Sequence, residues 1–301
     1  MNPAQQSHYE FLYQRHVNAL LRQGKADSTI DVYSRAVRRI SAYFERCPDT
    51  LTEDNLKDYF AALVKTHSWS TVKVDRNGLQ FFYSHVLKKD WPWIEIVKPP
   101  QKKILPDILT RKEIQQVINH TRELRYQTFI LTAYSMGLRL GEVLHLHVGD
   151  IDSAQMKVHV RLGKGKKDRF VTLPQRTLYA LRFYWSTHRH PHFLFPRGQN
   201  SEKRHVATET MDRGGVQKAF KAILKSCRIH KTITPHSLRH CYGAHLVEAN
   251  VHLRAIQAEM GHECPKTTAL YTQLTDIVQQ DSHRIINTLM DELDVTLDGD
   301  V

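Results

Sequence analysis

Apolar side chains recur every three or four positions along the first 90 residues, which is the spacing of one face of an α-helix. The segments with this pattern are residues 7–23, 28–46, 51–67 and 70–90. We expect Gly24 to end the first helix, and Ser28 to cap the second, which Pro48 ends. Thr52 is the expected cap of the third helix, and Gly78 is expected to interrupt the fourth. The pattern predicts a small bundle of amphipathic helices.

A break in composition follows this bundle. Residues 91–106 contain four prolines and three lysines, a content that is typical of a linker and unlike that of the flanking helices. The sequence therefore predicts a helical domain over residues 1–95, a basic linker over 96–106, a second domain over 107–290 and an acidic tail over 291–301.

The second domain opens with a capping box from Thr110 to Glu113, and a largely apolar helix follows and stops at Gly137. Arg139 stands at the start of the next helix. Residues 156–162 then alternate apolar and polar side chains, and residues 169–173 form the return strand of a predicted hairpin. Lys164 lies on its turn, in a stretch that lacks the GxxxxGK[ST] pattern of a nucleotide-binding loop. Helices are expected over 178–188 and 216–229, with a polar loop over 198–215 between them.

The stretch from residue 234 to 274 carries the densest candidate chemistry. Thr234 and Pro235 predict a helix start, and His236 and Arg239 share one face beside that start. Free backbone amides and the helix dipole favour an anion there, so a histidine and an arginine indicate a phosphate pocket. Gly261 ends the following helix and leaves His262 on a turn, and Tyr271 lies near the end of a further helical turn.

The net charge of +12 indicates a polyanionic partner, with DNA or RNA first, although a basic solvated surface is the alternative. Residues 106–290 carry 27 Lys/Arg against 15 Asp/Glu, so the second domain has most of the excess. No RNA-recognition or KH motif supports an RNA partner. Several basic residues of the helical bundle are candidates to face a phosphate backbone: Arg35, Arg38, Arg39, Lys73 and Arg76.

Other classes of protein are disfavoured by what the sequence lacks. No apolar run approaches the length of a membrane span, and no signal-peptide core is present at the N-terminus. The four cysteines form no CxxC pair, so neither a disulfide framework nor a zinc ribbon is indicated, and we expect a cytoplasmic protein without a membrane partner. A metal site at His262 and Cys264 is a weaker alternative.

Five separated motifs, GLRLGEV, GKGKKDR, HSLRH, MGH and TALYT, occur in an order that resembles the catalytic domain of the tyrosine recombinase (phage integrase and Xer-type) family. The resemblance covers residues 107–290, and the N-terminal bundle is similar to the family's SAM-like core-binding domain. It implies a mainly α fold with a small β-sheet, in which a helical DNA-binding bundle precedes a mixed α/β catalytic domain. Asn250 stands where a glycine is more usual in the family, and asparagine tolerates the left-handed conformation.

The resemblance also implies the roles of six residues. Arg139 and Arg239 become the paired arginines that hold the phosphate, Lys164 the acid for the leaving 5′ oxygen, His236 and His262 the two histidines, and Tyr271 the nucleophile. A guanidinium suits this task because it is always charged and pairs with phosphate through two parallel hydrogen bonds. Free tyrosine has a pKa of about 10, so the phenol needs a proton acceptor, either His236 or a water. This chemistry needs no cofactor, metal or ATP.

Three functions compete at this stage. The first is a site-specific recombinase or integrase of DNA, of a simple Xer-like or mobile-element type. The others are a type IB topoisomerase-like strand transferase and a non-catalytic DNA-binding protein that kept the fold; the complete set of six residues argues against the latter. The family implies double-stranded DNA as partner and a homo-tetramer on it. The amphipathic segment after Tyr271, with Ile277 and Ile285, is expected to dock on a neighbouring protomer.

Overall fold

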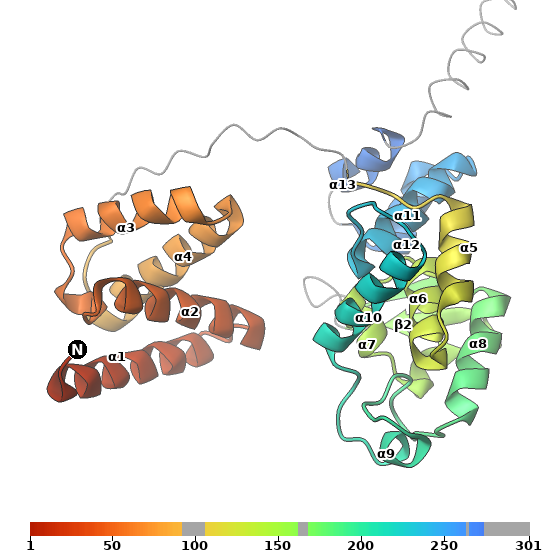
Figure 1. The fold of residues 1–301 in the computed structure, drawn as a ribbon, viewed down its shortest axis with the longest axis horizontal. Helices are drawn as coiled ribbons and strands as arrows, with labels where there is room; N and C mark the ends of the chain where they lie inside the picture. The colour runs from red at the N-terminus through yellow and green to blue at the C-terminus, as the bar shows by residue number, and fades with distance from the viewer. Residues whose placement is uncertain (92–105, 162–167, 263–264, 274–301) are drawn as a thin grey trace, which may run out of the picture. The chain divides into compact units, whose positions relative to one another are not determined.

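The computed structural model describes residues 1–91, 106–161, 168–262 and 265–273 of the chain, and within the last range it leaves out the side chains of residues 266, 267, 270 and 273. The chain divides into two compact units, residues 1–103 and 104–301. Figure 1 shows the helices of each unit. In the described part of the chain, no helix is both long and apolar enough to cross a membrane.

The first unit is a bundle of four α-helices with two short irregular turns. Its elements are α1 (Pro3–Arg22), α2 (Asp27–Phe44), the 3-10 helix η1 (Pro48–Thr50), α3 (Glu53–Thr66), α4 (Trp69–Phe82) and the π-helical turn η2 (Tyr83–Leu87). Thr52 caps α3 as predicted, because its side chain accepts a hydrogen bond from the amide of Asn55. The apolar faces of the helices meet in one core that includes Leu20, Ile40 and Phe82.

Three predictions in this unit are wrong. The second helix begins at Asp27, before Ser28, and its N-cap Ala26 makes no side-chain hydrogen bond. The helix ends at Phe44, ahead of Pro48, because Glu45 turns into the left-handed conformation with φ of 51°. Gly78 does not interrupt α4: a Cβ there would lie 3.0 Å from Cα of Tyr33, so the glycine lets α4 pack closely on α2.

Arg39, one of the residues expected to face phosphate, has a structural partner instead. Its Nη1 donates a hydrogen bond of 2.6 Å to the carboxylate of Asp75, which is buried. The Tyr59 hydroxyl donates to the same oxygen at 2.9 Å. A buried carboxylate is stable only when it is paired, so Arg39 holds α2 against α4.

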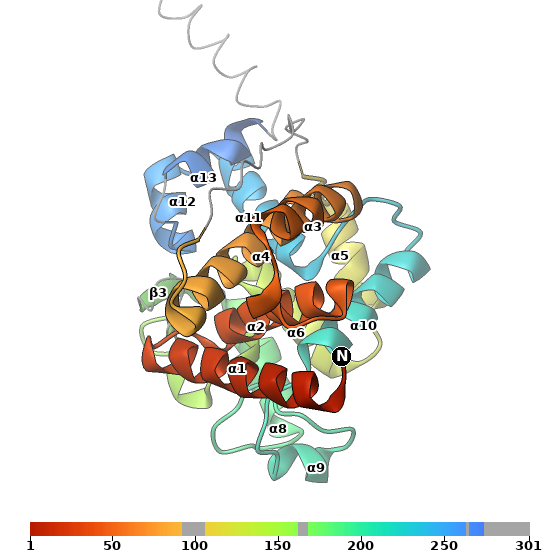
Figure 2. The same cartoon turned by 90° about the vertical axis from the view of Figure 1, so that its left-hand side faces the viewer.

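The second unit surrounds a central apolar helix. Its elements are α5 (Arg111–His120), α6 (Leu124–Ser135), α7 (Leu140–Leu144), η3 (Val148–Asp150), β1 (Ile151–Asp152), β2 (Lys157–Val160), β3 (Arg169–Thr172), α8 (Gln175–Ser186), α9 (Ser201–His205), α10 (Arg213–Ser226), α11 (Pro235–Glu248), α12 (Leu253–Met260), α13 (Pro265–Ala269) and η4 (Leu270–Gln273). Helix α6 packs against α5, α8, α10 and α11, and Figure 2 shows α12 and α13 together beside α11.

The sheet is antiparallel in the order β1-β2-β3. The predicted hairpin is confirmed by the pairing of Val158 with Val171, both of which are buried. Strand β1 was not predicted, because two residues are too short to show an alternating pattern. The expected polar loop over 198–215 contains the short helix α9, capped by the Asn200 side chain, and the first residues of α10.

Candidate active site

The N-terminus of α11 presents the first part of the candidate site. Thr234 caps this helix in a capping box with Ser237, and Pro235 occupies its first turn, as the sequence predicts. Asn250 follows the helix end in the left-handed conformation, with φ of 59°. These caps fix where α11 begins and ends, so they also fix the positions of His236 and Arg239 on its first two turns.

Arg239 is buried, with 2% of its surface exposed. Its Nη1 donates to the carbonyl of Gly137 at 2.6 Å, and its Nη2 donates to the carbonyl of Met260. These carbonyls lie at the C-terminal ends of α6 and α12, each two residues before Arg139 or His262. Burial and the charge of Arg139 lower the pKa of Arg239 to about 10, so it remains a cation at neutral pH. Arg239 therefore ties three helix ends together around one buried positive charge.

Arg139 stands at the N-cap of α7 and pairs with Glu142 in the same turn. Its amide donates to Oε2 of Glu142 at 2.8 Å and its Nη1 donates to Oε1 at 2.7 Å. The guanidinium of Arg169, on β3, donates to the same two oxygens at 2.8 and 2.9 Å. Burial alone would raise the pKa of the Glu142 carboxyl, but the hydrogen bonds and charges of Arg169 and Arg139 lower it to about 2. One carboxylate thus holds two arginines.

Tyr271 lies in η4, and its side chain is fully buried against α11. Its ring packs on Gly243, and its hydroxyl lies 3.4 Å from Nδ1 of His240. Burial raises the pKa of the Tyr271 phenol to about 12, although Arg239 and Arg139 act in the opposite direction. The phenol is therefore neutral at neutral pH and needs a proton acceptor before it can act as a nucleophile.

Two histidines contact this tyrosine, and a third contacts one of them. The ring of His262 stacks on the Tyr271 ring with centroids 6.0 Å apart, and its Nδ1 lies 3.0 Å from the Thr268 hydroxyl. The ring of His236 meets that of His240 edge to face at 5.0 Å. Burial, followed by nearby positive charges, lowers the pKa of His262 and of His240 to about 4 and that of His236 below its ordinary value. A neutral imidazole has one nitrogen that can accept a proton.

Five of the six predicted site residues therefore gather around α11, namely Arg139, His236, Arg239, His262 and Tyr271. Lys164 lies outside the described residues. Neither His240 nor Arg169 is among the residues predicted from the sequence. His240 had a visible signal, because it lies four residues after His236 on the same helix face. Arg169 ends the GKGKKDR motif, but its partner Glu142 is 27 residues away in sequence.

One group in the described part of the chain has the spacing of a metal site, and it belongs to the first unit. The ligand atoms of His8, Cys47 and Asp49 lie within 4.8 Å of one another. His8 and Asp49 already form an ion pair of 2.8 Å, and burial raises the pKa of the Cys47 thiol to about 12. The Cys47 thiol is therefore protonated at neutral pH. Cys264, the partner considered for His262, lies outside the described residues.

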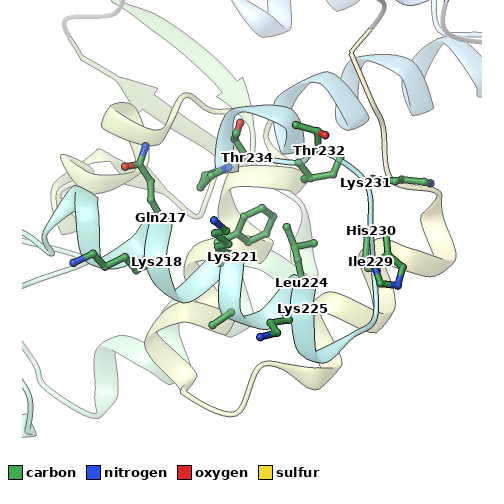
Figure 3. A pocket seen from close by; sticks show the side chains of 14 residues that line it. Gln217, Lys218, Lys221, Leu224, Lys225, Ile229, His230, Lys231, Thr232 and Thr234 are labelled. Carbon is green, nitrogen blue, oxygen red and sulfur yellow. The ribbon is translucent and has the colours of Figure 1, made fainter.

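A groove of about 780 Å³ opens between α10 and the segment that leads into α11. Figure 3 shows Lys218, Lys221 and Lys225 at its wall. They follow one another three and four residues apart and so share one face of α10. Its apolar lining includes Phe220 and Leu224. The lining also includes Thr234 and Pro235, where α11 starts.

Comparisons with known proteins give the family of both units. The model of the phage integrase family matches residues 107–277, and that of the phage integrase N-terminal SAM-like domain matches residues 12–93. An integrase/recombinase of Sinorhizobium fredii is 34% identical over 245 residues, which cover 80% of this chain and 77% of the relative. A tyrosine recombinase of Thermosipho africanus is 28% identical over 264 residues, 83% of this chain and 90% of the relative.

Solved structures resemble the fold. The Tn1549 transposon integrase, in a complex with transposon right-end DNA, aligns over 91% of this chain and 99% of its own with a TM-score of 0.67. The two chains are 18% identical, so this likeness concerns the fold alone. It agrees with the predicted mainly helical architecture and its small sheet.

Proposed function

The chain belongs to the phage integrase family and is a tyrosine-type site-specific recombinase, and we propose that Tyr271 is the nucleophile with which it cleaves and rejoins DNA. One observation supports this assignment most. The Tyr271 hydroxyl lies beside α11, within the electrostatic influence of both Arg139 and Arg239 and next to the neutral His240. A phenol buried only for packing would have no need of two nearby arginines and two contacting histidines.

The reaction follows from the chemistry of these groups. Oη of Tyr271 attacks the phosphorus, the bond from phosphorus to the 5′ oxygen breaks, and a 3′-phosphotyrosyl link forms. Arg139 and Arg239 hold the non-bridging oxygens, where negative charge develops. The departing 5′ oxygen takes a proton from Lys164, which we retain as the proposed acid. A 5′-hydroxyl of a second strand reverses the same steps and joins a new partner.

His240 becomes a further candidate to take the phenol proton, beside His236 or a water. Its Nδ1 is 3.4 Å from the hydroxyl, and its lowered pKa keeps it neutral. A guanidinium has five N–H donors, and two nitrogens of Arg239 each donate to a backbone carbonyl. We assign the remaining N–H donors of Arg239 to the phosphate. Because Tyr271 is fully buried, η4 has to shift for the hydroxyl to reach DNA.

We propose double-stranded DNA as the substrate and a homo-tetramer as the active assembly, acting in the cytoplasm. The lysines of α10 support a DNA partner, since phosphate contacts of this kind position a protein on a duplex. The segment from 277 to 290 lies outside the described residues, and we retain it as the proposed contact between protomers. Deletion of residues 277–301 is then expected to abolish assembly on DNA and to spare monomer binding; unchanged tetramer formation would reject this role.

Covalent trapping on fragmented DNA tests the proposed function. Wild-type protein is incubated without metal on fragments that contain nicks, the mixture is denatured, and the DNA that stays attached is sequenced. Recurrent attachment at one sequence supports a site-specific recombinase and identifies its site. Attachment scattered over all sequences favours a topoisomerase-like transferase. DNA binding without attachment to any fragment contradicts the enzyme and favours a binding protein.

A further inference from the structure

Arg169 lies outside the six residues to which the reaction was assigned, yet it contacts the partner of one of them. We propose that Arg169 is a positioning residue that holds Glu142 and thereby aims Arg139 at the DNA phosphate. The role of Arg139 in this statement rests on the proposed function, whereas the contacts of Arg169 do not.

The geometry around Glu142 distinguishes the two arginines. Arg169 approaches with a parallel fork, Nη1 to Oε1 at 2.8 Å and Nη2 to Oε2 at 2.9 Å. Arg139 uses only Nη1 of its side chain, at 2.7 Å from Oε1, together with its backbone amide. The carboxylate of Glu142 and the guanidinium of Arg169 are both largely buried, whereas Arg139 is the more exposed of the two arginines. Arg169 therefore uses both donors of its fork on Glu142. The side chain of Arg139 uses only Nη1 on Glu142, so Glu142 does not occupy the fork with which Arg139 would bind a phosphate.

This division has a physical consequence for Arg139. With Arg169 present, the single negative charge of Glu142 is shared between two guanidinium groups. Without Arg169, both carboxylate oxygens become available to Arg139 alone, and a buried carboxylate attracts its nearest cation strongly. We therefore expect Arg139 to rotate into the fork that Arg169 leaves and to turn away from the phosphate.

Arg169 also packs against the residue before His262. A Cβ at Gly261 would lie 2.6 Å from Cδ of Arg169, and Gly261 has a φ of +63°. On the same strand, the amide of Thr172 donates to the carboxylate of Glu259 in α12 at 2.6 Å. Strand β3 is therefore fastened to α12 directly before His262 and to α7 beside Arg139. Its arginine is placed to set the distance between these two site residues.

The test replaces Arg169 by methionine, which keeps much of the side-chain volume and removes the fork. Arg161→Met is the matched control: Arg161 follows β2 in the same hairpin and also pairs with a buried carboxylate, that of Asp150. Both variants lose an arginine–carboxylate pair from the same sheet, so a general loss of stability affects both. Arg169→Lys keeps the charge and loses the parallel geometry.

The first readout is single-turnover cleavage of nicked DNA. We expect Arg169→Met to slow cleavage roughly 10- to 100-fold with DNA affinity unchanged, since small misplacements of a catalytic group cost this much. Arg161→Met should stay within about threefold of wild type. The deficit of Arg169→Met relative to wild type should also shrink as the pH falls, because the loss of Arg169 raises the pKa of Glu142 and protonation removes the carboxylate that misdirects Arg139. A loss of folded protein would scale the rate equally at every pH.

A double variant shows whether Arg169 acts through Glu142. Arg169→Met combined with Glu142→Gln should cleave no more slowly than Arg169→Met alone, because the carboxylate that misdirects Arg139 is gone. If the double variant instead lost rate by the product of the two single-variant factors, Arg169 and Glu142 would act independently and the proposal would be overturned.

A second readout does not depend on cleavage. In protein labelled with ¹⁵N-arginine, the Nε resonance of Arg139 should shift in Arg169→Met and stay in place in Arg161→Met. An unchanged resonance in Arg169→Met rejects the positioning role. If the wild type forms no covalent adduct but the resonance shifts, the proposed reaction fails while the coupling from Arg169 to Arg139 stands.

Discussion

The ring of Tyr271 packs so closely on Gly243 that a Cβ at position 243 would lie 2.5 Å from its Cε2 atom. Real Cβ atoms do not approach a ring carbon this closely, so the position of the tyrosine depends on the absence of a side chain in α11. The glycine costs helix stability, as glycine does in any helix interior. The missing side chain allows the phenol to pack directly against the helix that carries His236 and Arg239.

Gly243→Ala is expected to displace the Tyr271 ring and to slow formation of the covalent DNA adduct roughly 100-fold. Overpacking of this kind also costs about 1–3 kcal/mol of folding stability, so adduct formation is compared at a temperature where the variant is folded. Gly149→Ala is the control, since a Cβ there meets no heavy atom within 4 Å. Equal adduct yields from the two variants would show that the ring position is not needed.

Arg239→Ala removes the buried cation and should lower the cleavage rate by at least ~10³-fold, because the developing charge loses a fixed partner. The carbonyls of Gly137 and Met260 lose a donor as well, which costs about 1–3 kcal/mol for each buried group. Arg239→Lys keeps a charge but loses the fork, so an intermediate rate is expected. Arg197→Ala, at an exposed arginine, is the control. A rate for Arg239→Ala within about tenfold of wild type would contradict the phosphate-holding role.

The first unit should lose stability as the pH falls, because His16 is fully buried between Phe81 and Phe82. Burial lowers its pKa to about 4, so the unfolded chain binds a proton at higher pH than the folded chain does. The contribution of this histidine is complete above about pH 6.5 and is lost as the pH falls towards 4, by roughly 3 kcal/mol.

His16→Leu should flatten this pH dependence, whereas substitution of the exposed His67 should not. Urea denaturation between pH 4 and 7, read by hydrogen exchange over residues 1–91, measures both. If the dependence of folding stability on pH is the same in His16→Leu as in wild type, His16 is excluded as its source.

The features that the sequence predicted correctly depend on neighbours in the chain. The cap at Thr110 is confirmed, since its hydroxyl accepts a hydrogen bond from the amide of Glu113 and the carboxylate of Glu113 accepts one from the amide of Thr110. Gly137 and Gly261 end their helices in the left-handed conformation, as glycine in those positions indicates. The alternation along residues 156–162 also placed Val158 and Val160 inside. Such signals are local, and short-range geometry decides them.

The features that the sequence did not predict depend on contacts between distant segments. Gly78 was expected to interrupt a helix, but its lack of a side chain instead allows α4 to pack closely on α2. Arg39 was expected at a phosphate, but it pairs with Asp75, 36 residues away. The carbonyl of Gly137 that holds Arg239 is 102 residues from it. A residue type and its spacing indicate which chemistry is available, whereas its partner becomes visible only when the chain is folded.

The location of the covalent bond tests the central claim most directly. Wild-type protein is trapped on nicked DNA, the DNA is digested to a nucleotide remnant, and tryptic peptides are sequenced by mass spectrometry. The account predicts a nucleotide attached to Tyr271 through its phosphate, and no attachment in Tyr271→Phe, which should still bind DNA. A nucleotide on another residue, or an adduct that persists in Tyr271→Phe, would contradict it.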